Sequence, residues 1–168
     1  MSRPKIVAIV GKSKSGKTTL LEKVIPELNR RGYRVGTVKH HFHAGFDFDK
    51  PGKDSWRMAA AGASAVSMVS PGKMFLIQNT EAEMALDDVR DLMSGVDIVL
   101  AEGFLSTAQE RIEIVREDNG GELLCPPEEL RAVITDMPIH IKDLKRIPLD
   151  DISCLADFLE SRYIRSNT

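Results

Sequence analysis

The chain has 168 residues, of which 42% are hydrophobic and 29% charged, as is typical of a globular protein with one sizeable core. We therefore expect a single domain over residues 1–168. The formal net charge of −2 argues against nucleic acid as a partner, and no apolar run approaches the roughly 20 residues of a membrane span. The first residues lack the layout of a signal peptide, so we expect a cytoplasmic protein without a membrane anchor.

Predicted strands and helices alternate along most of the chain. Short apolar runs rich in Val and Ile predict strands at Lys5–Val10, Arg34–Lys39, Ala65–Ser70, Met74–Gln78, Asp97–Ala101, Ile112–Val115 and Arg131–Thr135. Helical spacing predicts helices up to Arg31, over Ser55–Ala61, over Glu81–Met93 and from Asp150 or Asp151 onward. This order indicates an α/β fold of three layers with a mostly parallel sheet. The Pro71-Gly72 pair predicts an antiparallel hairpin between two of the strands.

Two features bear on where the helices begin and end. Pro26 lies inside the first predicted helix, where a kink or an early break can occur. Thr80 and Glu83 have the spacing of a capping box, which predicts that the third helix begins directly after Thr80.

The stretch from Gly11 to Thr18 matches the phosphate-binding P-loop pattern. It lies between a predicted strand and a predicted helix, as phosphate binding by loop amides and a helix N-terminus requires. We expect Lys17 to neutralise the β- and γ-phosphates and the Thr18 hydroxyl to ligate Mg²⁺. The residues predicted to bind nucleotide here are Gly11, Lys12, Ser13, Lys14, Ser15, Gly16, Lys17, Thr18 and Thr19. The motif therefore predicts a P-loop NTPase fold.

Glu102 is the predicted acidic partner of the P-loop. It ends the apolar run that starts at Asp97 and is followed by Gly103. P-loop enzymes place a second acid at such a strand end, where it holds Mg²⁺ or orients the attacking water. Asp97, at the other end of the run, is interpreted as a residue of the strand start.

The segment from His40 to Asp54 is a long loop with little apolar content, which favours a functional role. Asp47 and Asp49 alternate along it, so in an extended loop both carboxylates point the same way and suit water-mediated Mg²⁺ ligation or positioning of a nucleophile. A polar, solvated loop is the alternative. His40, His41 and His43 lack the spacing of zinc sites, as do Cys125 and Cys154 elsewhere in the chain. Catalytic candidates are thus Lys17, Asp47, Asp49 and Glu102, and metal candidates are Thr18, Asp49 and Glu102.

Two further residues have open interpretations. Lys12 stands second in the P-loop, where some dimeric P-loop ATPases use a lysine to reach the partner's phosphates, although a solvated lysine is equally consistent. Asp136 ends a late strand, where an aspartate can accept hydrogen bonds from guanine N1–H and N2–H₂. A turn aspartate before Met137-Pro138 is the alternative.

Taken together, three segments resemble the molybdopterin-guanine dinucleotide biosynthesis adapter proteins (MobB), a family of P-loop GTPases. They are the P-loop, Lys39-His40 followed by Asp47–Arg57 and Ala61–Ala63, and Asp97–Phe104. The resemblance implies binding of GTP with Mg²⁺, weak GTP hydrolysis, a homodimer, and assistance to the molybdenum cofactor guanylyltransferase that joins GMP to molybdopterin. It leaves open direct binding of molybdopterin.

The chain departs from the family at Leu105, where members often carry a lysine after Glu-Gly-Phe; Arg111 is the nearby basic residue that could replace it. Three alternatives to a GTPase accessory protein remain. A P-loop kinase for small molecules ranks lower, because the segment after Glu102 holds Arg111 and Arg116 but no dense arginine cluster. A metallochaperone GTPase for nickel insertion is supported only by His40–His43. A nucleotide-gated adapter with incidental hydrolysis overlaps the main hypothesis. No arginine finger is assigned, which is consistent with slow turnover.

Overall fold

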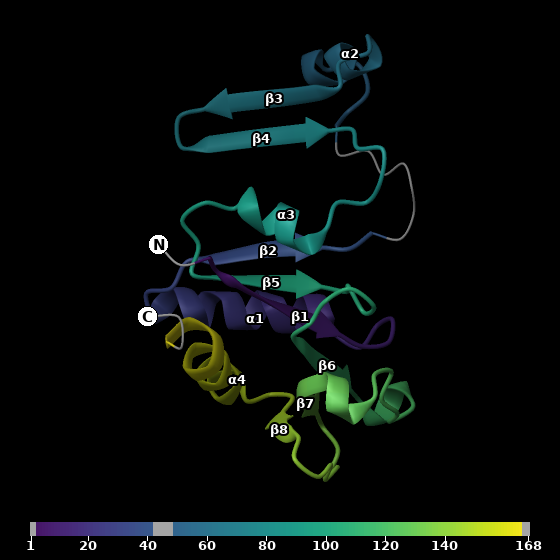
Figure 1. Ribbon diagram of the computed structural model, residues 1–168, viewed down its shortest axis with the longest axis vertical. Coiled ribbons are helices and arrows are strands. Elements are labelled where there is room, and N and C mark those ends of the chain that lie inside the picture. The colour runs from purple at the N-terminus through teal and green to yellow at the C-terminus, as the bar shows by residue number, and fades with distance from the viewer. Residues whose placement is uncertain (1–2, 42–48, 166–168) are drawn as a thin grey trace. The chain divides into compact units, whose positions relative to one another are not determined.

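The computed structural model describes residues 3–41 and 49–165, and the chain divides into two compact units (Figure 1). Of the described residues, 3–40 and 86–165 belong to the first unit, and 41 and 49–85 belong to the second. The P-loop and Glu102 both lie in the first unit. Within the described residues, no helix is long and apolar enough to cross a membrane.

The first unit contains a sheet of six strands in the order β2-β5-β1-β6-β7-β8, in which every neighbouring pair is parallel. The strands are β1 (Lys5–Val10), β2 (Val35–Lys39), β5 (Ile98–Glu102), β6 (Arg111–Val115), β7 (Leu130–Thr135) and β8 (Lys145–Pro148). The helices of this unit are α1 (Lys17–Arg30), α3 (Leu86–Asp91) and α4 (Ile152–Leu159), which continues as a π-helical segment over Glu160–Ile164. Short 3₁₀ turns lie at Glu117–Asn119 and Pro127–Glu129. The predicted fold class is confirmed.

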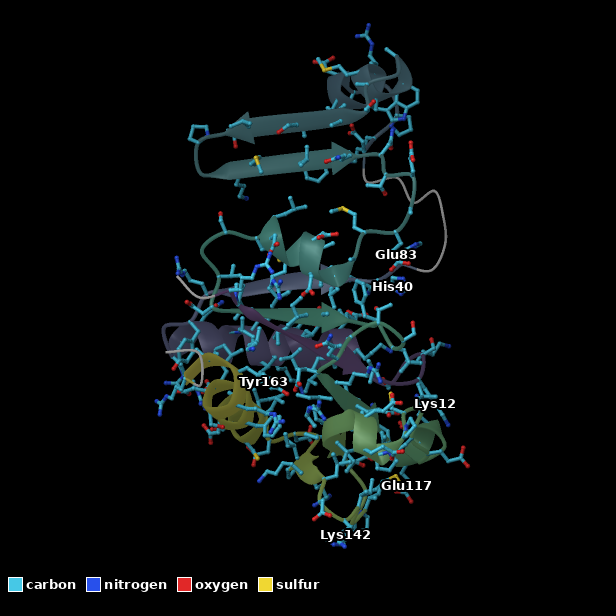
Figure 2. The ribbon with its side chains drawn as sticks, viewed as in Figure 1. Lys12, His40, Glu83, Glu117, Lys142 and Tyr163 are labelled. Atoms are coloured by element: carbon cyan, nitrogen blue, oxygen red, sulfur yellow. The ribbon has the colours of Figure 1, made fainter. Side chains whose placement is uncertain are left out.

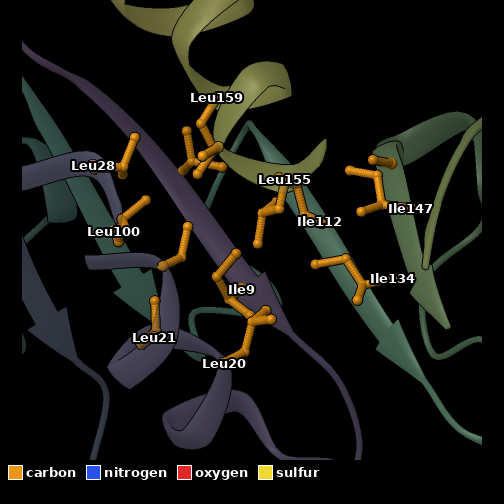
Figure 3. Packing of buried hydrophobic residues seen from close by; sticks show 14 of the residues in the cluster. Ile9, Leu20, Leu21, Leu28, Leu100, Ile112, Ile134, Ile147, Leu155 and Leu159 are labelled. Atoms are coloured by element: carbon orange, nitrogen blue, oxygen red, sulfur yellow. The ribbon is translucent and has the colours of Figure 1, made fainter. Parts of the chain in front are cut away.

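One face of this sheet packs against α1 and α4. Ile9, Leu100 and Ile112 project from the strands and pack with Leu28 of α1 and Leu155 of α4 (Figure 3). All five side chains are fully or almost fully buried. Because the central strands bury both faces, they consist of near-continuous apolar runs, which is why sequence patterning located them.

Loops and the start of α3 contribute apolar residues to the opposite face. Phe104 and Cys125 pack there on a second apolar cluster, and Leu86 of α3 lies against its edge. The fully buried carboxylate of Glu113 accepts backbone N–H groups from Leu124 at 2.6 Å and Cys125 at 3.0 Å. Burial, together with the Glu113 carboxylate, raises the pKa of the Cys125 thiol. Glu113 therefore anchors the end of the β6–β7 loop to the sheet.

The second unit consists of α2 (Asp54–Ala60) and an antiparallel hairpin of β3 (Ala65–Ser70) and β4 (Lys73–Gln78). The predicted hairpin is confirmed, with its turn at Pro71-Gly72. Among the described residues these two strands pair only with each other. Several of their apolar side chains are exposed, namely Met68, Val69, Met74, Phe75 and Leu76.

Three details differ from the sequence-based expectations. The third helix begins at Leu86, not after Thr80, because residues 81–83 are exposed whereas Leu86 packs against an apolar cluster of the first unit. Strand β8 was missed, because it is a short edge strand in which only Ile147 is buried. Helix α1 continues through Pro26 to Arg30, so no break occurs there.

Candidate functional site

The P-loop leaves the sheet at the carboxyl end of β1 and leads into α1. At Gly11 the backbone has φ +148°, and a Cβ there would lie 2.7 Å from the carbonyl oxygen of Ile114 in β6. At Gly16 the backbone has φ +92°, but a Cβ would meet no atom within 4 Å. Gly11 is thus required because a side chain there would collide with the sheet. Gly16 is required because its backbone conformation favours glycine, although the space around it is open. The Ser15 hydroxyl is buried beneath the loop without a hydrogen-bond partner in the described residues.

The Lys17 side chain folds back over the loop that precedes it. Its ammonium group donates hydrogen bonds to the carbonyl oxygens of Gly11 and Lys12, both at 2.9 Å. The pKa of Lys17 is lowered overall. Burial is the largest cause; the charge of Glu102 opposes it, and the charge of Lys39 adds to it. In P-loop proteins, the loop backbone and a lysine ammonium held beside it together bind the anionic phosphate chain.

Thr18 and Glu102 meet at the carboxyl end of the sheet. Strand β5 lies beside β1, with Glu102 opposite Ile9, so the parallel register brings the end of β5 next to the P-loop. The Thr18 hydroxyl donates a hydrogen bond to Glu102 Oε2 at 2.8 Å. A hydroxyl and a carboxylate oxygen are both hard ligands, which fit Mg²⁺. The structure thus brings together Lys17, Thr18 and Glu102, three residues chosen from the sequence.

Lys39 adds a second positive charge that sequence reasoning did not assign. It ends β2, where it pairs in register with Glu102 of β5, and its ammonium lies 2.9 Å from Glu102 Oε1. The signal was present, since Lys39 ends a predicted strand and is one of the residues carrying the family resemblance. The sequence did not reveal the strand order, which places β2 beside β5.

The β6–β7 loop packs against the other side of the P-loop. The Asn119 side-chain amide donates to the Ser13 carbonyl oxygen at 3.1 Å, and the Lys12 ammonium lies 3.8 Å from the Glu122 carboxylate. Figure 2 shows Lys12 and Glu117 on the same side of the first unit. Lys12 therefore contacts its own chain in this structure, and a reach toward a partner subunit stays a prediction. Asn119 carries no motif and was not predicted.

Asp136 lies at the carboxyl end of β7, as predicted, but its carboxylate has partners within the protein. It accepts the backbone N–H of Glu117 at 3.0 Å and lies 3.4 Å from the Arg116 guanidinium. These contacts tie the start of the β6–β7 loop to β7. Recognition of guanine by Asp136 stays a prediction.

The other singled-out residues have separate locations. His40 packs on Phe104 with ring centroids 4.9 Å apart, and Asp97 accepts the backbone N–H of Arg34 at the start of β5. Leu105 is exposed, and Arg111 forms an ion pair with Glu129.

The structure does not test the roles predicted for the two loop aspartates. Asp49 belongs to the second unit, where its carboxylate accepts the backbone N–H of Lys50. Asp47 lies outside the described residues, as does His43. Roles of Asp47 and Asp49 in holding Mg²⁺ or water stay predictions.

Comparisons with known proteins point to one family. The family model of "Molybdopterin guanine dinucleotide synthesis protein B" matches residues 6–136, a range that includes the P-loop, Lys39 and Glu102. Relatives described as molybdopterin-guanine dinucleotide biosynthesis adapter proteins, from Haemophilus influenzae and Escherichia coli, are each 37% identical. The matches cover 93% and 92% of this chain and 88% and 90% of the relatives.

Solved structures lead to the same family. A crystal structure of molybdopterin-guanine biosynthesis protein B superposes with a TM-score of 0.71 at 32% identity, covering 93% of this chain and 97% of the other. A MobB homologue from Bacillus stearothermophilus superposes with a TM-score of 0.69 at 28% identity, covering 96% and 98%.

Proposed function

Since the chain belongs to the molybdopterin guanine dinucleotide synthesis protein B family, we propose that it is an adapter in molybdopterin-guanine dinucleotide biosynthesis and that it works by binding GTP with Mg²⁺. In this role it assists the molybdenum cofactor guanylyltransferase that attaches GMP to molybdopterin. The observation that carries the nucleotide part is the hydrogen bond between Thr18 and Glu102 beside Lys17, because these residues offer one cation to the phosphates and two oxygen ligands to a metal ion.

Chemistry at this site rests on positioning and charge. Lys17 and the loop amides hold the terminal phosphates, and Thr18 with Glu102 would hold Mg²⁺. Bound Mg²⁺ would neutralise negative charge that develops on the phosphate oxygens. One of the acids Asp47, Asp49 or Glu102 orients the attacking water. Hydrolysis is expected to be slow, because an arginine finger, which contributes about 10³–10⁵ in rate, has no candidate in the sequence.

Calorimetric titration of GTP, GDP and ATP, with and without Mg²⁺, tests the nucleotide part. The Lys17→Ala variant should lose Mg²⁺-dependent binding, because it removes the charge that faces the phosphates. Lys23→Ala is the matched control, since Lys23 is an exposed lysine of the same helix and lies outside the P-loop. Unchanged GTP affinity in Lys17→Ala would contradict the phosphate site.

The adapter part is tested by co-purification with a molybdenum cofactor guanylyltransferase, and by measuring GMP transfer to molybdopterin with and without this protein. We expect the protein to raise the yield of the dinucleotide, and the Lys17→Ala variant to lose that effect. Direct binding of molybdopterin is measured in the same preparation by fluorescence of the pterin. An unaltered dinucleotide yield in the presence of wild-type protein would contradict the adapter role.

We further propose that the protein forms a homodimer through the β3–β4 hairpin. A two-stranded sheet is marginally stable alone, and both edges of this one lack a neighbour in the described residues. Met68 and Phe75 share one face, and Val69 and Met74 share the other, so both faces carry exposed apolar side chains. A second hairpin of the same kind could cover a face and pair with an edge in a symmetric contact.

Sedimentation equilibrium tests the dimer. Val69→Glu should weaken association, because Val69 is 78% exposed in the single chain and a charge would oppose its burial. Leu92→Glu serves as the control, because Leu92 is 64% exposed but lies in the first unit. An equal effect of both substitutions, or none of either, would rule out the hairpin as the interface.

A further inference from the structure

Lys39 occupies a position that neither the P-loop pattern nor the acidic partner explains. It is the last residue of β2, and the parallel register places it directly opposite Glu102. Its ammonium lies 2.9 Å from Glu102 Oε1, while Glu102 Oε2 accepts the Thr18 hydroxyl. Both carboxylate oxygens of Glu102 therefore already have partners within the protein.

The Lys39 side chain is far more exposed to solvent than the Glu102 side chain. The Glu102 side chain is 12% exposed, whereas that of Lys39 is 61% exposed. Bringing the Glu102 carboxylate out of water is costly unless a cation or donors compensate. Lys39 supplies that cation from the solvent side, and its long, exposed stem leaves it free to move away.

A divalent cation at Thr18 and Glu102 would compete with Lys39. Mg²⁺ takes carboxylate oxygen as a ligand, and the ammonium group carries charge of the same sign. At a separation of about 4 Å the repulsion between two such charges is modest in bulk water but several times larger near a protein surface, where the effective dielectric constant is lower. The Lys39 ammonium and the metal ion therefore cannot both sit on the Glu102 carboxylate at low cost.

We propose that Lys39 occupies the cation position at Glu102 when no metal is bound, and that Mg²⁺ binding breaks the Lys39–Glu102 ion pair. This inference rests on the metal site of the proposed function. Lys39 is a positioning residue, because it acts through Glu102: it holds the carboxylate aimed at Thr18 until the metal arrives. The displaced ammonium is then available beside the phosphate site.

The test measures binding of Mn²⁺ alone by electron paramagnetic resonance, with no nucleotide present. Lys39→Met keeps the length of the side chain and removes its charge, so it should bind Mn²⁺ roughly threefold to tenfold more tightly than the wild type. Lys39→Arg keeps the charge and should bind Mn²⁺ as the wild type does. Lys5→Met is the matched control, because Lys5 is an exposed strand residue at the opposite end of the sheet.

A cycle with Glu102→Gln separates local competition from a general charge effect. In the Glu102→Gln background, Lys39→Met should no longer raise Mn²⁺ affinity, because the shared carboxylate is gone. Lys39→Met that binds Mn²⁺ no better than the wild type, or Lys5→Met that gains as much, overturns the proposal. GTP binding in the presence of Mg²⁺ is measured on the same proteins; its absence in the wild type would contradict the proposed nucleotide function and leave the Mn²⁺ result intact.

Discussion

Replacing Gly11 by alanine tests whether the P-loop is built as its geometry indicates. The new Cβ would lie 2.7 Å from the Ile114 carbonyl oxygen and 2.9 Å from Ser15 Oγ. The first of these atoms belongs to the backbone of β6 inside the sheet, so it cannot move cheaply. A backbone φ of +148° adds strain for any residue with a side chain.

The two contributions set the expected magnitude. Backbone strain of this kind costs about 1–3 kcal/mol, and overpacking costs about 1–3 kcal/mol more, so the free energy of unfolding should fall by about 2–6 kcal/mol. Gly32→Ala is the matched control, because its φ is +91° but a Cβ there would meet nothing within 4 Å. It should cost only about 1–2 kcal/mol.

Urea unfolding followed by circular dichroism measures both variants against the wild type. Strain acts in both, whereas the close contact acts only at Gly11, so the difference between the variants isolates the packing of the loop on β6. Equal losses for the two glycines would refute the reasoning. In a Gly11→Ala protein that still folds, GTP binding should also weaken, because the loop must move away from the sheet.

The remaining predictions concern three carboxylates. Glu113→Gln should destabilise the fold by about 1–3 kcal/mol in urea titrations, because the two backbone N–H groups bond to different carboxylate oxygens and the amide replaces one of these oxygens with an NH₂ group that only donates. Asp136→Asn should weaken the preference for GTP over ATP in competition assays; an unaltered preference would mean that guanine is recognised elsewhere. Hydrogen bonds from Arg30 and Arg31 lower the pKa of Glu27 to about 2. Because a lowered folded-state pKa stabilises above the unfolded value, the advantage of wild type over Glu27→Gln should be complete near neutral pH and disappear as the pH falls from about 4.5 to 2.

Short sequence patterns predicted strands, loops and helices correctly wherever neighbouring residues alone determine the structure. The strand Lys5–Val10, the P-loop and the helix after it follow from an apolar run, two glycines and a helical apolar stripe. The capping box at Thr80 failed for the opposite reason. Its spacing is correct for a helix start, but the residues directly after it are exposed, and the helix forms from Leu86, which packs against an apolar cluster. Here tertiary context overrides a propensity of about 1 kcal/mol.

The candidate site shows the same division. The Thr18–Glu102 pair was predicted because P-loop chemistry requires an acid at a strand end, and Glu102 ends a recognisable strand. The contacts of Lys39 and Asn119 could not be predicted, because each depends on which strands are neighbours and on how a loop returns to the sheet. Asp136 was located correctly at its strand end, but the partners of its carboxylate come from the neighbouring strand's loop.

The sequence by itself determined the fold class, the phosphate loop, the acid that faces it and the resemblance to one family, because each is recognised from short motifs and apolar runs and from their order along the chain. The tertiary structure decided the strand order β2-β5-β1-β6, which brings residues from three separate segments to one edge. That order pairs Lys39 with Glu102 and packs the β6–β7 loop on the P-loop. Pairings of this kind depend on which strands become neighbours in the sheet, and an apolar run locates a strand without specifying its neighbours.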